Sequence, residues 1–206
     1  MPRYRALLAY DGTPFHGFQF NKGVETVEGV LTQAFSKFTR GNRKIQGASR
    51  TDAGVHAEGQ VVHFDYAGPM NTYQLARAFN GLIPRTIRVA LCEEVDTAFH
   101  ARHDAWGKRY SYSIWNHPVQ HPLYRKQLTF YPWKLDLEKM QQAAEYFLGE
   151  HDFSCLRASG CGAPSPVRCL ERIHLNVEGS LLRWTVDGTA FLKYMVRNLM
   201  GTLLEV

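Results

Sequence analysis

The sequence has no apolar run of the roughly 18 residues that a membrane-spanning helix requires. It also lacks the apolar segment of a secretory signal peptide, because a strand-like stretch, residues 4–10, follows the first residues directly. No low-complexity tract interrupts the chain. We therefore predict a folded protein that resides in the cytoplasm and does not associate with membranes.

Cysteine is scarce, with four residues in the chain, and no two of them have CxxC spacing. They are Cys92, Cys155, Cys161 and Cys169. Zinc sites and disulfide frameworks usually show closely or regularly spaced cysteines. We expect neither, and we expect free thiols. The nine histidines also form no recognisable ligand spacing, so no metal site is predicted.

What the sequence does have is apolar content and a positive charge balance. With 206 residues, 45% of them hydrophobic, the chain can form one large domain or two small ones. The net charge of +5 favours polyanionic partners, although solvated surface is the simpler explanation of any one basic group. The basic residues cluster as Arg40, Arg43 and Lys44; Arg102, Lys108 and Arg109; and Arg125 and Lys126.

The first half reads as β-α-β-α-β. Residues 3–10 are predicted to form a strand, and apolar residues from Val27 to Phe38 recur at helical spacing behind an N-cap at Thr26. A strand through residues 61–64, a helix over residues 72–79 and a strand over residues 87–95 follow.

The second half opens with an alternating strand, residues 108–114, and then a His- and Pro-rich loop, residues 116–125, of the kind that often contacts a ligand. A helix with apolar positions from Leu137 to Phe147 is predicted to be closed by Gly149. Two strands, residues 170–177 and 181–186, form a predicted hairpin. The last helix carries an apolar stripe, which is Leu192, Met195, Val196, Leu199, Met200 and Leu203.

Together these elements predict an α+β fold with two related halves around one mixed sheet and a cleft between them. The halves are residues 1–98 and 99–206, joined by a linker near residues 96–107. The first half ends on a strand, whereas the chain stops at Val206 directly after a helix. We therefore expect the sequence to be a fragment of a longer natural chain.

The segment with the clearest chemical character is residues 47–57, GASRTDAGVHA. Asp52 lies between Thr51 and Ala53, whose small side chains cannot cover it, and Arg50 precedes it by two residues. A polar loop beside a strand is a common way to present catalytic groups. The alternative is an ordinary turn, in which Asp52 accepts backbone N–H groups and Gly54 supplies a positive φ.

Three further stretches set the context of this loop: YDGTPFHGFQ at residues 10–19, FHAR at 99–102 with KRYSY at 108–112, and FLKYMVRNLMG at 191–201. In order and spacing, these segments and the loop resemble the TruA family of tRNA pseudouridine synthases over nearly the whole chain. The resemblance implies the pseudouridine synthase fold, with a mixed, mainly antiparallel sheet and a central cleft. It also implies that the family's C-terminal segment beyond the last helix is absent.

The resemblance further implies isomerisation of uridine to pseudouridine at positions 38, 39 and 40, in the anticodon stem-loop of tRNA, by a homodimer. Asp52 matches the catalytic aspartate, and Tyr110 matches the tyrosine that lies against the target base. Arg197 matches the arginine that pairs with the aspartate, and Arg50 the arginine that holds the target nucleotide out of the stack. No cofactor is expected, since the reaction reconnects the same atoms.

Several alternatives stay open from the sequence. Tyr110 can be a packed strand residue and Arg197 a solvated helix residue, while Asp11 can be a turn residue or an RNA contact. The carboxylate of Asp52 can attack the ribose or remove its C2′ proton. A non-catalytic RNA-binding module is the main competing function, and a nucleoside or glycoside hydrolase is the second. The basic loop over residues 116–126 matches no defined RNA contact.

Overall fold

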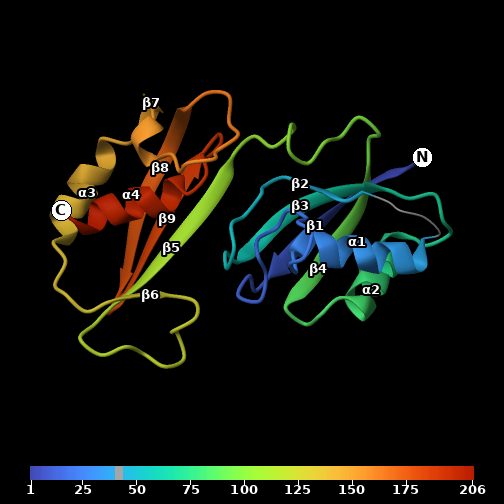
Figure 1. Cartoon of the computed structure of the whole chain (residues 1–206), viewed down its shortest axis with the longest axis horizontal. Coiled ribbons are helices and arrows are strands. Elements are labelled where there is room, and N and C mark those ends of the chain that lie inside the picture. The colour runs from blue at the N-terminus through green and yellow to red at the C-terminus, as the bar shows by residue number, and fades with distance from the viewer. Residues whose placement is uncertain (40–43) are drawn as a thin grey trace. The chain divides into compact units, whose positions relative to one another are not determined.

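The computed structural model describes residues 1–39 and 44–206 and forms two compact units, Met1–Ala105 and Trp106–Val206 (Figure 1). Arg40 and Arg43, which belong to a predicted basic group, lie outside the described residues. Residues 99–105 pack with the first unit: Arg3 donates to the Phe99 carbonyl at 2.9 Å, and the Ala101 N–H donates to Nδ1 of His63 at 3.2 Å. The linker region therefore contributes to the core of the first unit.

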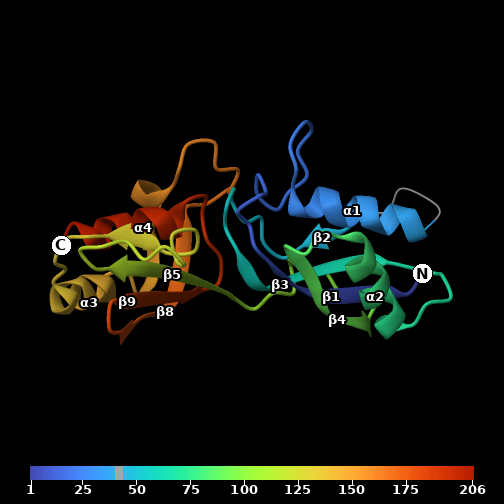
Figure 2. The same cartoon turned by 90° about the horizontal axis from the view of Figure 1, so that it is seen from below.

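The first unit is a four-stranded antiparallel sheet in the order β2-β3-β1-β4, with two helices packed on it. Its elements are β1 (Arg3–Tyr10), α1 (Val27–Phe38), β2 (Gln46–Gly47), β3 (Ala57–Asp65), α2 (Thr72–Leu82) and β4 (Ile87–Val95). Figure 2 shows α1 running along this sheet. Phe35 of α1, Phe64 of β3 and Phe79 of α2 contact one another, with ring centroids 4.9–5.6 Å apart. This aromatic cluster joins both helices to the sheet.

Most predicted elements of the first unit are confirmed. The strand over residues 3–10 and the one over 87–95 have the predicted bounds, and the Thr26 hydroxyl caps α1 by accepting the Gly29 N–H at 3.2 Å. Strand β3 begins four residues before its predicted start, and α2 continues to Leu82. Strand β2 was not predicted, because two residues show no periodicity.

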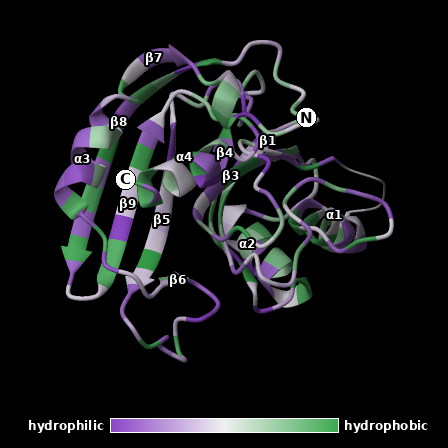
Figure 3. Ribbon diagram, turned by 60° about the vertical axis from the view of Figure 1, so that its left-hand side comes forward, coloured by the Kyte–Doolittle hydropathy of each residue, from purple (hydrophilic) through white to green (hydrophobic). Residues whose placement is uncertain are grey.

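The second unit is a five-stranded sheet in the order β6-β5-β9-β8-β7, antiparallel except for the parallel β5–β6 pair. Its elements are β5 (Lys108–Asn116), β6 (Thr129–Tyr131), α3 (Leu137–Glu145), β7 (Gly149–Asp152), the 3₁₀ helix η1 (Ser154–Leu156), β8 (Val167–Glu178), β9 (Leu181–Gly188) and α4 (Met195–Leu204). Polar and apolar residues alternate along β8 and β9 (Figure 3). Trp184 of β9 is buried in one core with Met140 of α3 and Leu199 of α4.

The β8–β9 hairpin is confirmed, with Glu178 paired to Leu181 and Gly179 at φ +60°. The prediction that Gly149 closes α3 is wrong: α3 ends at Glu145 with Tyr146 as its C-cap, and Gly149 begins β7. Leu192 is buried but precedes α4, which begins at Met195. The short strands β6 and β7 were not predicted.

The α+β class is thus confirmed. The single mixed sheet expected from the sequence is not observed among the described strands, which form two sheets, one within each unit. No helix in the described ranges is long and apolar enough to cross a membrane. Residues 1–39 and 44–206 also contain no group of three His, Cys, Asp or Glu side chains able to hold a metal ion. All four cysteines have free thiols.

Candidate active site

Asp52 lies in the loop between β2 and β3, and backbone hydrogen bonds hold this loop on both sides of it. The Phe18 N–H donates to the Thr51 carbonyl at 3.0 Å, and the Gly54 N–H donates to the Phe15 carbonyl at 3.2 Å. These bonds join the loop to the sequence motif at residues 10–19. Two segments that are distant in the sequence therefore fold together around Asp52, whose side chain is half-buried.

The fit between these segments depends on two glycines. A Cβ atom on Gly12 would collide with the Val55 carbonyl, and one on Gly17 would lie 2.8 Å from the Thr51 carbonyl oxygen. Gly17 also has a φ of +91°, which other residues adopt only with strain. The absence of side chains at both positions lets the two backbones approach each other closely.

Side chains add a second set of contacts to the loop. The amide of Gln60 accepts the Ser49 N–H at 3.2 Å and donates to the Ser49 carbonyl at 2.7 Å. Gln60 is buried in β3, so the base of the loop is fixed from the sheet. The hydroxyl groups of Tyr10 and Thr51 lie 2.8 Å apart and share a hydrogen bond next to Asp52.

Asp11 and His56 link the other end of the loop to the 10–19 motif. Nδ1 of His56 lies 3.2 Å from the Gly12 N–H nitrogen and 3.1 Å from Oδ1 of Asp11. Oδ1 of Asp11 also accepts the N–H of Thr13 at 3.0 Å and its hydroxyl at 2.6 Å. Asp11 therefore has the turn role that the sequence allowed.

Arg50 and Asp52 occupy the same loop, but their exposure differs. The side chain of Arg50 is exposed and that of Asp52 is half-buried. The loop thus presents a cation to solvent and keeps the carboxylate partly covered. Such an arrangement suits an anionic ligand that approaches from solvent.

Tyr110 lies on β5 opposite Val186 of β9 and is half-buried. Its ring meets that of Phe191 edge to face, with centroids 4.8 Å apart. Tyr112, two residues along the strand, accepts a hydrogen bond from the Thr129 hydroxyl at 2.9 Å and so links β5 to β6. The two tyrosines therefore differ in role, because Tyr112 is bound within the sheet and Tyr110 packs on the segment before α4.

Arg197 lies exposed on the first turn of α4, and a tyrosine ring holds its guanidinium group. The Arg197 guanidinium carbon is 5.5 Å from the centroid of the Tyr194 ring, and Lys193 Nζ is 5.4 Å from the same centroid. These distances are typical of cation–π contacts. Tyr194 is the N-cap residue of α4 and has a φ of +61°, the one positive φ outside glycine among the described residues.

A neighbouring segment clamps the backbone next to Tyr194. The Ala158 N–H donates to the Lys193 carbonyl at 3.1 Å, and the Lys193 N–H donates to Sγ of Cys161 at 3.5 Å. This N–H lowers the pKa of the Cys161 thiol. Asn198 of α4 donates to the Leu156 carbonyl at 2.9 Å. Contacts on both sides therefore maintain the left-handed conformation of Tyr194.

The motif HDF at residues 151–153 is architectural. Nε2 of His151 lies 2.7 Å from the Leu148 carbonyl oxygen, and Phe153 is buried in the second core. The hydroxyl and N–H of Ser154 lower the pKa of Asp152. These contacts shape the turn after α3.

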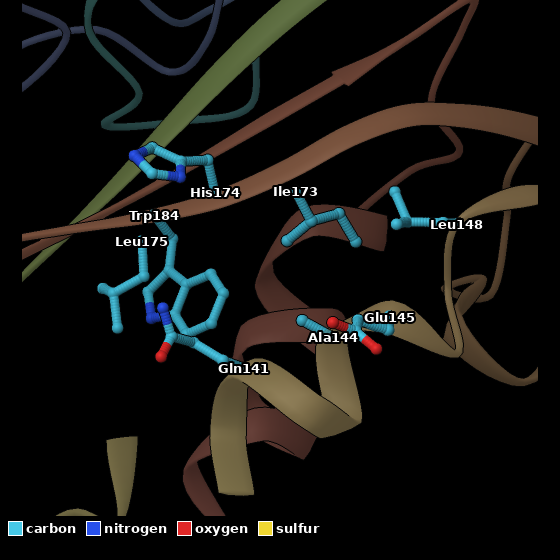
Figure 4. A pocket seen from close by; sticks show the side chains of 8 residues that line it. All are labelled: Gln141, Ala144, Glu145, Leu148, Ile173, His174, Leu175 and Trp184. Carbon is cyan, nitrogen blue, oxygen red and sulfur yellow. The ribbon is translucent and has the colours of Figure 1, made fainter. Parts of the chain in front are cut away.

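A pocket of about 180 Å³ lies elsewhere in the second unit, between α3 and strands β8 and β9 (Figure 4). Its lining residues are Gln141, Ala144, Glu145, Leu148, Ile173, His174, Leu175 and Trp184. No predicted site residue is among them. The pocket is therefore separate from the groups that the sequence selects.

The sequence assigned no role to three side chains that hold the site residues in place: Gln60, His56 and Tyr194. The role of Gln60 could have been predicted, because a polar residue at a core-facing strand position is unusual. Tyr194 carried no signal, since a left-handed tyrosine cannot be read from its neighbours.

A model of the tRNA pseudouridine synthase family matches residues 6–104 and 143–206, more than half of the chain. The chain belongs to this family. The matched residues include Arg50, Asp52 and Arg197, whereas Tyr110 lies between the two matched segments.

Relatives within this family match over nearly the whole chain. A tRNA pseudouridine synthase A from Acetivibrio thermocellus is 40% identical over 206 residues, which cover 100% of this chain and 84% of the relative. The enzyme of that name from Neisseria gonorrhoeae is 40% identical over 205 residues, covering 99% and 77%. The one from Xanthobacter autotrophicus is 39% identical over 207 residues, covering 100% and 84%.

Proposed function

We propose that this protein isomerises uridine to pseudouridine at positions 38, 39 and 40, in the anticodon stem-loop of tRNA, with Asp52 as the catalytic residue. Family membership supports the reaction and the tRNA substrate. The observation that supports the catalytic role of Asp52 is its position. Backbone hydrogen bonds between Phe18 and Thr51 and between Gly54 and Phe15 fix the loop on either side of it. A catalytic carboxylate needs such a fixed position.

The reaction breaks the bond between uracil N1 and ribose C1′ and forms a bond between C5 and C1′. As the first bond breaks, positive charge develops on the ribose, and the Asp52 carboxylate stabilises or attacks it. In the second route the carboxylate removes the C2′ proton and a glycal forms. Both routes continue with rotation of the uracil and end with formation of the C5–C1′ bond and transfer of the C5 proton, by way of solvent, to N1. In the first route any ester bond between Asp52 and C1′ breaks as the C5–C1′ bond forms, and in the second the protonated Asp52 returns its proton to C2′ at that step. Neither route requires a cofactor.

The other site residues act on the nucleotide and on Asp52. Tyr110 stacks on the target base, with its ring held by Phe191, and such stacking contributes about 1–3 kcal/mol. Arg197 pairs with the Asp52 carboxylate and keeps it ionised and oriented. Arg50, exposed on the same loop as Asp52, holds the target nucleotide out of the stack, a step that costs a few kcal/mol.

The proposal extends to the arrangement of the chain. The two units correspond to the related halves of the pseudouridine synthase fold, each with its own sheet. Residues 1–98 carry the Asp52 loop, and residues 99–206 carry the tyrosine strand and the arginine helix. The working enzyme is a cytoplasmic homodimer.

Replacement of the carboxylate tests the catalytic role. We expect Asp52→Asn and Asp52→Ala to lower pseudouridine formation by about 10⁴-fold or more, while tRNA binding is largely kept. Carbodiimide labelling and sequencing of unmodified tRNA would measure the product and its positions. Glu58→Ala, which removes an exposed carboxylate of β3, is the matched control and should leave activity unchanged.

The same experiment separates the competing functions. Unchanged product formation by Asp52→Ala would refute Asp52 as the catalyst. A non-catalytic RNA-binding module predicts that the wild-type chain binds tRNA and forms no pseudouridine. A hydrolase predicts free uracil in the reaction mixture, whereas a synthase releases none.

A further inference from the structure

The loop of residues 117–128, here called the β5–β6 loop, exposes large apolar and aromatic side chains. Val119 is 67% exposed, Leu123 is 76% exposed and Tyr124 is 43% exposed. In Figure 1 the loop extends beyond the strands it connects, near the label of β6. Neither segment matched by the family model includes it, and none of the proposed site residues lies in it.

Hydrogen bonds join the two ends of the loop, so the backbone that carries its exposed side chains is fixed at its base. Residues 114–116 of β5 pair in parallel with residues 129–131 of β6. The Asn116 side-chain amide donates to the carbonyls of Tyr131 and Trp133, each at 2.8 Å. The chain therefore leaves the sheet and returns to it at one place, as in a compact Ω-type loop.

Aromatic rings organise the interior of the loop. The Trp115 ring lies 5.8 Å from that of His117, 5.3 Å from that of His121 and 5.7 Å from that of Tyr124. The rings of His121 and Tyr124 are stacked, with centroids 4.5 Å apart and an interplanar angle of 29°. The Trp115 indole N–H donates to the Val119 carbonyl at 3.0 Å. The loop thus presents preorganised flat surfaces rather than a flexible polar chain.

The sequence on both sides of these rings carries charge of one sign. Between Asp104 and Asp136 it contains no Asp or Glu. Arg125, Lys126 and Lys134 lie in the loop or after it, whereas Lys108 and Arg109 begin β5 at its other end, where Arg109 pairs with Asp187. Arg125 and Lys126 directly follow Tyr124, and both are exposed. Cations beside aromatic faces match single-stranded RNA, in which phosphates alternate with bases that can stack.

We propose that the β5–β6 loop is an additional tRNA-binding surface, in which Tyr124 and His121 stack with an unpaired base and Arg125 and Lys126 contact neighbouring phosphates. The inference rests on the proposed tRNA substrate and adds a contact to it. A symmetric contact with the same loop of a second copy would fit the charge pattern less well, because it would bring Arg125 and Lys126 of both copies together with no acidic residue in the loop to pair with them.

Two loop variants of the full chain test this surface, one for stacking and one for charge. In an Asp52→Asn background, which prevents turnover, Tyr124→Ala should weaken binding of unmodified tRNA by about 5- to 100-fold. The double variant Arg125→Ala with Lys126→Ala should weaken binding and lower the slope of log affinity against log salt by about 1 per lost phosphate contact. Filter binding over a salt series measures both effects.

The control variants replace a tyrosine and a lysine that lie outside the β5–β6 loop. Tyr146 is 84% exposed at the end of α3, and Lys139 is exposed on α3, so Tyr146→Ala and Lys139→Ala should bind tRNA like the parent. Urea unfolding followed by far-UV circular dichroism would verify that each loop variant is folded. In the active chain, the loop variants should raise KM and leave kcat at saturating tRNA unchanged.

The outcomes separate this inference from the proposed function. If the wild-type chain forms no pseudouridine, the proposed function fails, while the binding comparison still decides the role of the loop. Binding within twofold of the parent for both loop variants overturns the inference. Light scattering tests whether a second copy of the chain binds the loop instead. The assignment to RNA is overturned if the loop variants lose tRNA affinity only when their oligomeric state also changes. It is also overturned if their oligomeric state changes while tRNA affinity does not.

Discussion

The two units hold their proposed site residues in different ways. In the first unit, Asp52 lies on a loop that backbone hydrogen bonds tie to residues 15–18. In the second unit, Tyr110 and Arg197 lie on a strand and a helix, and aromatic side chains contact both of them. The comparison teaches that the first arrangement is sensitive to backbone fit, whereas the second depends on particular side chains.

The largest expected effect comes from breaking the backbone fit in the first unit. Gly17→Ala places a Cβ atom 2.8 Å from the Thr51 carbonyl oxygen at a positive φ. We expect the free energy of unfolding of this unit to fall by about 2–4 kcal/mol, and pseudouridine formation to fall with it, because overpacking and backbone strain add. Hydrogen exchange of β3 amides and product sequencing measure the two quantities.

Gly23→Ala is the matched control. Gly23 has a similar φ of +88°, but a Cβ atom there meets nothing within 4 Å. In Gly23→Ala the free energy of unfolding should fall only by the cost of the positive φ, about 1 kcal/mol, and activity should be fully kept. Equal losses in the two variants would show that close approach at Gly17 does not matter.

Acid should affect the first unit more than the second, because His63 is a buried histidine of β3. Burial, together with the nearby charges of His100 and Arg3, lowers the pKa of His63 to about 4, although Asp65 and Asp104 oppose the shift. In the unfolded chain the histidine pKa is near 6.5. Between about pH 6.5 and pH 4 the unfolded chain therefore binds more protons than the folded one, so the free energy of unfolding falls as the pH falls through this range. We expect a loss of about 2 kcal/mol between pH 7.5 and pH 5.

The tryptophans make this difference measurable, since Trp106, Trp115, Trp133 and Trp184 all belong to the second unit. Hydrogen exchange of β3 should report the acid effect, and tryptophan fluorescence should report it less. His63→Gln keeps an acceptor for the Ala101 N–H and removes the titration, so its stability should lose the pH dependence. A pH dependence that persists in this variant would assign the effect to another group.

The smallest expected effect separates stability from activity in the second unit. Tyr194→Gly relieves the left-handed backbone, so stability should stay equal or rise by up to about 1 kcal/mol. The variant also removes the ring beside Arg197, and we expect pseudouridine formation to fall about tenfold. Tyr194→Phe keeps the ring and should retain activity, and urea unfolding with product assays would compare both. A parallel loss of stability and activity in Tyr194→Gly would contradict a positioning role.

Local sequence pattern was sufficient for the longer elements. The strand-like stretches over residues 3–10 and 87–95 predicted β1 and β4 with their observed bounds, and helical spacing with an N-cap predicted α1. Strands β6 and β7 have three and four residues, and β7 is exposed throughout, so neither shows a periodic pattern. The start of α4 was misplaced because a left-handed Tyr194 interrupts an apolar stripe that continues on both sides of it.

The sequence by itself determined the chemical groups: a carboxylate at Asp52 among small neighbours, a cation at Arg50, and a ring at Tyr110. It also determined that two glycines stand in the 10–19 motif. Only the tertiary structure decided that those glycines accommodate the Asp52 loop and that Phe191 packs on Tyr110. The physical reason is that residue type and spacing reflect local conformational preference, whereas close approach between distant segments depends on how the whole unit packs.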